Sequence, residues 1–345
     1  MRILSRRFCI PAARRILLAT GLFLYPLAAT AGPGIAEGFA LRNQNPFLQI
    51  FGLPTFQSAA LAEPGMFDYE LSFDIANHAD NGDNDREDFV VDGETYFLTL
   101  SLRRRVTEKL EFGVDVPFIA HDDGFLDNGI ESWHDTFGMS NTKRRGPSNV
   151  LEFRYVLDGE LLFGLDTPAS GLGDIQVTAA MQLREGSENS GSVLTLRSSV
   201  KLPTGDEQEL LGSGAMDFSV GLYAANSHTL FNRAFDVSGF GGVLLLGDSD
   251  ILGDLQRTAV PFGGMAASWH ATDRLALMAQ VYVQGDYINS ELEELGGESI
   301  QLGVGGVYRW PEQAVSLKVA IVEDFLANAT TDFGMHFSIG WEGGR

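Results

Sequence analysis

Apolar and polar residues alternate along most of this 345-residue chain, in runs that end at turns. In residues 68–75, the side chains of Tyr69, Leu71, Phe73 and Ile75 share one face, and the residues between them are polar. A period of two is the side-chain repeat of a β-strand. Twelve strands are predicted, at 68–75, 95–103, 110–118, 172–184, 192–202, 215–225, 234–246, 258–269, 274–285, 299–309, 314–323 and 332–341.

The loops between these strands alternate in length. One set is short, at 107–109, 186–191, 226–233, 271–273 and 310–313. The other set is longer or more acidic, at 79–93, 119–171, 203–214, 247–257, 286–297 and 324–331. Strand alternation alone also fits a soluble sandwich, but short periplasmic turns opposite long external loops are typical of outer-membrane barrels. The sequence therefore predicts an all-β fold, an antiparallel transmembrane β-barrel of about 12 strands.

Two smaller elements are predicted inside the long loop at 119–171. VLDGEL at 156–161 has an Asp-Gly pair between apolar residues, which favours a small hairpin. Residues 124–138 have helical periodicity, and an apolar face is formed by Leu126, Ile130, Trp133 and Phe137. His134 lies among acids on the opposite face; we interpret it as part of a polar surface rather than a metal site. The apolar face must be buried, which predicts a lid over the barrel mouth or, alternatively, a helix at the membrane rim.

The first 31 residues have the pattern of a secretory signal peptide. Five arginines precede or flank an apolar core at 16–28, and small residues at 29–31 follow it. We expect three parts: a signal at 1–31, an N-terminal segment at 32–66 and the barrel at 67–345. The only cysteine, Cys9, lies in the signal, so the mature chain has no thiol for a disulfide, a metal or a nucleophile.

The net charge of the mature chain limits its possible binding partners. Without the signal, 19 basic residues remain against 46 acidic ones, a net charge of −27, which makes nucleic acid a poor partner. After the signal, no apolar run reaches the roughly 18–20 residues of a membrane-spanning helix. We expect contacts with outer-membrane lipid and lipopolysaccharide, and insertion by the barrel-assembly machinery.

The polar face of the predicted strands would line the lumen. The candidates are Glu111, Asp115, Asp174, Gln176, Arg197, Lys201, Asp217, Gln280, Gln284, Lys318 and His336. Because these residues carry charges of both signs, they could pair across the lumen. The opposite face of the last strand is apolar, and aromatic residues at strand ends match the girdles of membrane barrels.

The N-terminal segment is too apolar for a solvated tail. Its central part contains Asn45, Pro46, Phe47 and Phe51, which we predict to plug the lumen. A barrel of about 12 strands has a narrow interior that a short insert can fill. The alternative is a periplasmic flap packed against the barrel rim.

Neither a cofactor nor a metal is expected. The acidic residues at 80–88 lack the glycine and ligand spacing of a calcium loop, so a solvated external loop is the better interpretation. A hydrolase would need a serine and a histidine within hydrogen-bond reach. The six histidines show no such pattern, although His121 with Asp122 and Asp123 offers a weak match to a barrel-type protease. The protein is predicted not to be an enzyme.

Four parts of the chain resemble known outer-membrane proteins. RNQNPFLQIFGLP at 42–54 and FLDNGIESWHDTFG at 125–138 resemble an uncharacterised, domain-of-unknown-function family of proteobacterial outer-membrane proteins. GLGDIQVTAAMQL at 171–183, and VKLPTG at 200–205 followed by GSGAMDFSVGL at 212–222, are also similar to barrels encoded with the meta-pathway of phenol degradation. The resemblance implies a barrel in the bacterial outer membrane, without an assigned activity.

Three functions remain open at this point. The first is a channel for passive or gated passage of a small solute, which could be hydrophobic. The second is a plugged barrel with a structural or envelope-assembly role. The third and weakest is an outer-membrane hydrolase.

Overall fold

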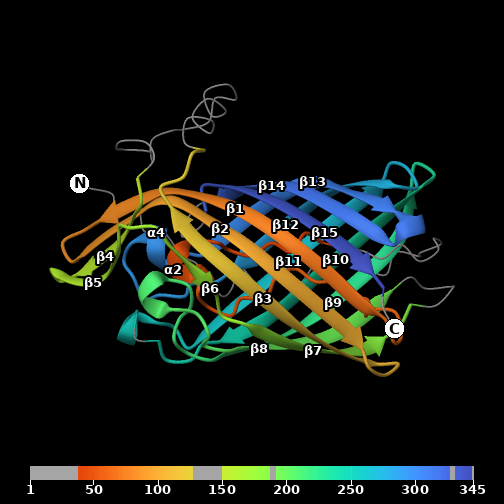
Figure 1. Ribbon diagram of the computed structural model, residues 1–345, viewed down its shortest axis with the longest axis horizontal. Coiled ribbons are helices and arrows are strands. Elements are labelled where there is room, and N and C mark those ends of the chain that lie inside the picture. Colours follow the sequence, from red (N-terminus) through yellow and green to blue (C-terminus); the bar gives the residue numbers. More distant parts are fainter. Residues whose placement is uncertain (1–37, 127–149, 187–191, 250, 327–330, 344–345) are drawn as a thin grey trace, which may run out of the picture.

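Twelve strands close into an antiparallel barrel in the part of the chain that the computed structural model describes, namely residues 38–126, 150–186, 192–249, 251–326 and 331–343 (Figure 1). Each strand pairs with the next, and the last pairs with the first. They are β1 (Phe67–Asp83), β2 (Glu87–Arg105), β3 (Leu110–Asp122), β7 (Gln176–Arg184), β8 (Val193–Lys201), β9 (Asp217–Leu230), β10 (Arg233–Leu245), β11 (Ala259–His270), β12 (Leu275–Gln284), β13 (Ser299–Trp310), β14 (Val315–Leu326) and β15 (Phe333–Glu342). The predicted fold class is confirmed.

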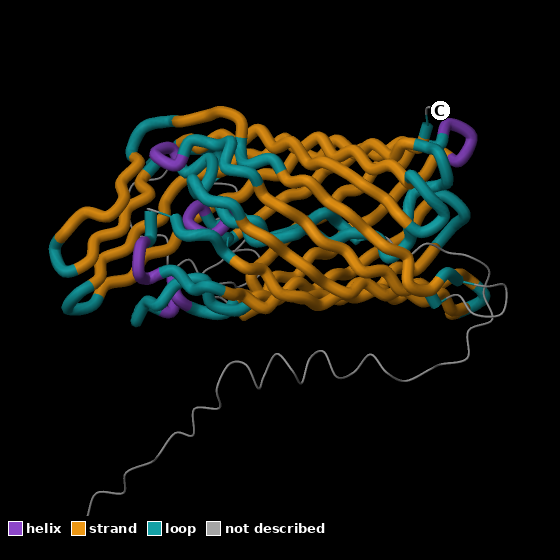
Figure 2. The backbone as a smooth tube through the Cα atoms, turned by 90° about the horizontal axis from the view of Figure 1, so that it is seen from below, coloured by secondary structure: helices purple, strands orange, loops and turns teal. Residues whose placement is uncertain are grey.

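The two ends of the barrel differ. One end has short turns, and the C-terminus lies there, while the other has the longer connections (Figures 1 and 2). We call these the periplasmic end and the outer end, following the arrangement of outer-membrane barrels. The helices α2 (Pro46–Gln49) and α4 (Glu293–Gly296) lie toward the outer end.

The predicted hairpin is present at the outer end. Its strands are β4 (Glu152–Leu157) and β5 (Glu160–Leu165), joined by the turn at Asp158 and Gly159. Because β4 pairs with the first residues of β2, the hairpin extends the barrel wall outward (Figure 1). A further short strand, β6 (Ala169–Leu172), pairs with the end of β3 and precedes β7.

One expectation about the loops is wrong. The acidic stretch 79–93 was expected to be a loop, but β1 continues to Asp83 and β2 begins at Glu87. The two strands pair without interruption from Asn77–Glu94 to Asp83–Asp88. The acids of this stretch are tolerated because Asp83 and Asp85 are exposed near the turn, whereas the buried Glu87 accepts hydrogen bonds from Ser290 Oγ and Glu291 N.

The outer surface of the barrel is apolar. Side chains exposed on it include Leu71, Phe73, Leu98, Leu100, Phe112, Phe118, Leu222, Leu277, Val304, Phe337 and Ile339. At the periplasmic end, Tyr69 stacks on Trp341 at 5.1 Å, and Tyr308 contacts Trp310. Such a surface needs lipid around it, and a closed ring leaves no strand edge unpaired there. The protein is an outer-membrane β-barrel.

No helix among the described residues is long and apolar enough to cross a bilayer.

Residues 38–66, here called the inner segment, lie inside the ring of strands. Phe39, Phe47 and Phe51 are fully buried, and the segment contacts inward-facing residues of strands on opposite sides of the barrel. Residues 45–49 form a single helical turn because the Asn45 side chain accepts from Phe47 N and Pro46 occupies the first turn. The core of the barrel therefore consists of the inner segment packed against the inward-facing residues of the strands.

Candidate functional site: the barrel lumen

Polar wall residues bind the backbone of the inner segment. Gln280 accepts from Phe39 N at 2.8 Å and donates to Phe39 O at 3.0 Å. Lys201 Nζ donates to Ile50 O at 3.0 Å, and Asp217 Oδ2 accepts from Gly52 N at 2.8 Å. An irregular buried chain cannot satisfy its own amides, so the wall supplies the partners.

The same pattern continues toward the periplasmic end. Arg197 donates to Ser58 O at 3.0 Å and to Ala60 O at 3.2 Å. Glu111 accepts from Ala62 N at 2.6 Å, and Arg197 pairs with Glu111 at 2.9 Å. These bonds hold the returning half of the inner segment against β3 and β8.

The predicted lumen residues all lie on the inward side of the wall. Buried ones are Glu111, Asp174, Gln176, Arg197, Lys201, Asp217, Gln280, Gln284, Lys318 and His336. Asp115 is partly buried and binds Arg103 through both oxygens at 2.8 Å. The same alternation places Glu70 and Asp74 of β1 inward, although neither was singled out as a candidate; Glu70 pairs with Lys318 and Asp74 with His336, each at 2.7 Å.

The charges pair along the wall instead of across the lumen. Lys201 lies between Asp174 at 2.7 Å and Asp217 at 3.2 Å, and each of these partners comes from a neighbouring part of the wall. The physical reason is that the inner segment occupies the centre and separates the charged side chains of opposite walls in the described part of the chain.

Asp174 connects three segments that carry the family resemblance, namely 171–183, 200–205 and 212–222. Its carboxylate accepts from Thr204 N at 2.9 Å, Gly205 N at 2.8 Å and Ser213 N at 3.1 Å, in addition to Lys201. At Gly212, a Cβ atom would come within 2.3 Å of Asp174 Oδ1, so only glycine allows this approach. The Gly-Asp and Pro-Thr-Gly elements therefore belong to one hydrogen-bonded cluster around Asp174.

Aromatic side chains fill the outer part of the lumen. Phe47 contacts the rings of Phe89 and Phe163, with centroids 5.6 Å apart in both cases. Phe51 stacks on Tyr287 at 5.4 Å. Phe163 belongs to the β4–β5 hairpin, so this extension of the wall packs on α2.

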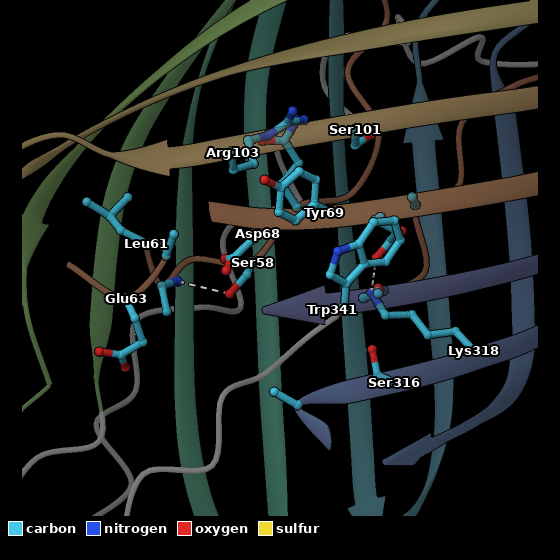
Figure 3. A pocket seen from close by; sticks show the side chains of 18 of the residues that line it. Ser58, Leu61, Glu63, Asp68, Tyr69, Ser101, Arg103, Ser316, Lys318 and Trp341 are labelled. Carbon is cyan, nitrogen blue, oxygen red and sulfur yellow. Dashed lines mark hydrogen bonds and ion pairs between the residues drawn. The ribbon is translucent and has the colours of Figure 1, made fainter. Parts of the chain in front are cut away.

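The inner segment leaves a cavity at the periplasmic end. It measures about 410 Å³ and lies between residues 38–63 and the wall formed mainly by β1, β2, β14 and β15 (Figure 3). Among the residues that line it are Ser58, Tyr69, Ser101, Arg103, Lys318 and Trp341. Its charged side chains are of both signs, and Arg103, Arg197 and Lys318 each pair with a carboxylate.

A second, smaller cavity of about 40 Å³ adjoins the first. The two share Ala40, Thr55 and Ser101 as lining residues, so together they form a polar column along β1, β2 and β3. Phe97 lines the smaller cavity and belongs to a separate apolar cluster with Ile119 and Leu211. This cluster lies at the outer end of the column.

The predicted lid helix falls largely outside the described residues, namely at Ile130, Trp133, His134 and Phe137. At its described start, Leu126 N donates to Glu94 Oε1 at 2.6 Å, and Phe125 is exposed. The lid therefore stays a prediction.

The described histidines and acids do not gather into a metal-binding cluster, and His78 and His121 instead contact another protein group. Across the residues that the structure describes, no three or more His, Cys, Asp or Glu side chains are placed to share a metal ion. His121 Nδ1 lies 2.9 Å from Thr95 Oγ1, and His78 Nε2 lies 3.0 Å from the same oxygen. In the acidic stretch, Asp88 pairs with Arg154 at 2.8 Å.

Comparisons with solved structures agree with the barrel architecture. The COG4313 outer-membrane channel from Pseudomonas putida F1 is similar, with a TM-score of 0.52 and 14% identity over 82% of this chain and 97% of the other. The P. putida toluene transporter TodX (11% identity over 92% and 96%) and a P. aeruginosa FadL homologue (14% over 93% and 99%) both score only 0.35. At these identities the likeness concerns the fold alone.

Sequence comparisons place the chain in a family. A search of curated proteins found no match. A family model described as "Protein of unknown function (DUF3187)" matches residues 16–342, nearly the whole chain. The chain therefore belongs to the DUF3187 family of proteins of unknown function.

Proposed function

We propose that this protein is a gated outer-membrane channel for a small solute and that the structure represents its closed state. The observation that carries the proposal is the polar column formed by the two adjoining cavities. The column begins at the periplasmic end and runs between the inner segment and β1, β2 and β3. A barrel with a purely structural role has no need of such a space.

The lining favours a solute that carries a polar or charged group over a purely apolar one. Arg103, Lys318 and their carboxylate partners form much of the wall of the larger cavity. A hydrophobic solute would have to displace water from these charges without replacing its hydrogen bonds, which is unfavourable. Apolar side chains, among them Phe56, Leu61 and Trp310, line other parts of the same cavity and could contact the rest of such a solute.

Closure of the column is assigned to Phe97, Ile119 and Leu211. Leu211 comes from the connection between β8 and β9, whereas Phe97 and Ile119 belong to the wall. Moving Leu211 would remove one side of the barrier without unfolding a strand. The inner segment narrows the remainder of the lumen and is held there by its bonds to the wall.

The test compares the wild-type protein with a variant that lacks residues 38–64. Both are reconstituted in planar bilayers, after a change in gel migration on heating has shown that each barrel is folded. The wild type should conduct ions rarely, and the variant should show larger and steadier conductance, because the β1–β15 closure does not use the deleted residues. Equal conductance would contradict the assignment of this segment to channel closure and would favour a structural role.

A further inference from the structure

Arg42 of the inner segment has an unusual environment. Its guanidinium lines the smaller cavity and lies 5.8 Å from the centre of the Phe97 ring. Within the described residues, Arg42 makes no hydrogen bond or ion pair, while its neighbours Leu41 and Asn43 are buried. A guanidinium has five N–H donors in a fixed plane, and leaving them without acceptors inside a protein is costly.

The acids around this cavity are already occupied. Asp74 binds His336 at 2.7 Å, Asp115 binds Arg103 at 2.8 Å, and Asp174 binds Lys201 at 2.7 Å. Asp74 and Asp115 act on Arg42 only through space. The guanidinium therefore has no hydrogen-bonding partner among the described residues, and its donors are available to whatever enters the cavity.

The shape of the column indicates what could enter. The smaller cavity has room for a group of a few heavy atoms beside Arg42, and the larger cavity could hold the rest of a small molecule. The shared boundary at Ala40, Thr55 and Ser101 consists of small, uncharged side chains. A guanidinium supported by an aromatic face is well suited to bind a planar carboxylate through two parallel hydrogen bonds.

We propose that Arg42 binds the carboxylate of a small organic anion whose remainder lies in the larger cavity. This inference rests on the proposed function, because it names the solute class for the same column. Arg42 then acts as a recognition residue inside the closed channel, and Phe97 both supports its guanidinium and closes the column beyond it.

The test measures binding to the folded, full-length protein in detergent by titration calorimetry. The probes are benzoate, benzamide and benzylamine, which share a ring and differ in charge. Benzoate should bind, and both other probes should bind at least about tenfold more weakly, because a charge-assisted bidentate contact is stronger than a neutral one. Benzylamine binding as well as benzoate would overturn the assignment of an anion site.

Variants locate the site. Arg42→Gln should weaken benzoate binding by about tenfold or more, and Arg42→Lys by an intermediate factor, since it keeps the charge and loses the planar fork. Arg274→Gln, in a periplasmic turn where Arg274 pairs with Glu312, is the matched control and should bind like the wild type. Gel migration before and after heating confirms that each variant is folded.

The outcomes separate this inference from the channel proposal. Absence of benzoate binding to the wild type, or equal affinity in folded Arg42→Gln, would overturn the Arg42 site. Such a result would leave the conductance comparison unaffected, because binding is measured at equilibrium without transport. Conversely, specific binding in a protein that never conducts would support the site and contradict the channel.

Discussion

The periplasmic and outer halves of the lumen are lined by the same strands but hold the inner segment by different interactions. In the periplasmic half, Arg197, Glu111 and Lys318 bind the backbone of the inner segment or pair with one another, and a cavity of about 410 Å³ remains. In the outer half, the rings of Phe47, Phe89 and other aromatic residues pack together around α2. One half holds the inner segment by directional bonds, and the other by apolar burial.

This difference indicates which half of the lumen closes the proposed channel and which half would bind its solute. Apolar packing leaves little space for water, so we propose that the outer half is the barrier to solute passage. Hydrogen bonds hold the inner segment to the wall without filling all the space between them. The polar column lies in the space that remains. The two halves should therefore respond differently to substitution.

The largest effect is expected in the apolar half. Phe47→Ala removes a ring that is fully buried between Phe89 and Phe163, and should lower the free energy of unfolding by about 3–5 kcal/mol. Urea unfolding in detergent micelles measures the change. Phe231→Ala is the matched control, because Phe231 is 83% exposed in the turn between β9 and β10. A loss below about 1 kcal/mol at Phe47 would mean that α2 does not seal the outer half.

A smaller effect is expected where the polar wall binds the inner segment. Asp217→Asn replaces one of the two acceptors that bind Gly52 N and Gly247 N, and removes a negative charge beside Lys201. The free energy of unfolding should fall by about 1–3 kcal/mol, and brief channel openings should become more frequent. The control is Asp273→Asn, at a side chain that is 98% exposed. Unchanged openings in Asp217→Asn would show that this contact does not restrain the segment.

The smallest effect concerns the exposed tip of the outer half. Arg86 binds Asp158 of the β4–β5 turn at 2.7 and 2.8 Å, and this hydrogen-bonded pairing lowers the pKa of the Asp158 carboxyl below its ordinary value of 3.8. A lowered carboxyl pKa stabilises the folded turn above that value, and the contribution is lost as pH falls through the lower, folded pKa.

Limited proteolysis of the hairpin between pH 6 and pH 3 checks this expectation, with an acid-tolerant protease. Wild-type cleavage should rise only below about pH 4, whereas Asp158→Asn should show no such step. A step of equal size in the variant would show that the pH dependence does not come from Asp158.

The strands were predictable because their pattern is local. Alternation located all twelve barrel strands, and the Asp-Gly pair at 158–159 located the hairpin. The extension of β1 and β2 through 79–93 was missed, because acids at every second or third position resemble a solvated loop when the partner strand is unknown. The break at 173–175 between β6 and β7 depends on Asp174 meeting residues 204–213, a contact between distant parts of the chain.

The site was less predictable than the strands. Period two indicates that Lys201 and Gln280 face inward, but it does not reveal whether water, a solute or backbone meets them. Arg42 lies in a segment without regular periodicity, and its position beside Phe97 follows only from the path of the inner segment through the barrel. Ile119 and Leu211, which we propose close the column, come from parts of the chain whose proximity the alternation does not encode.

Two adjacent leucines allow the most direct test of the closed column. Leu210 belongs to the large apolar core, whereas Leu211 contacts Phe97 and Ile119 at the end of the column, and both are buried. Either Leu→Ala change should cost about 2–5 kcal/mol of stability, so stability alone does not distinguish them. In single-channel recordings, Leu211→Ala should open far more often than the wild type, while Leu210→Ala should remain mostly closed. Equal opening of the two variants, or opening of Leu210→Ala alone, would contradict the account.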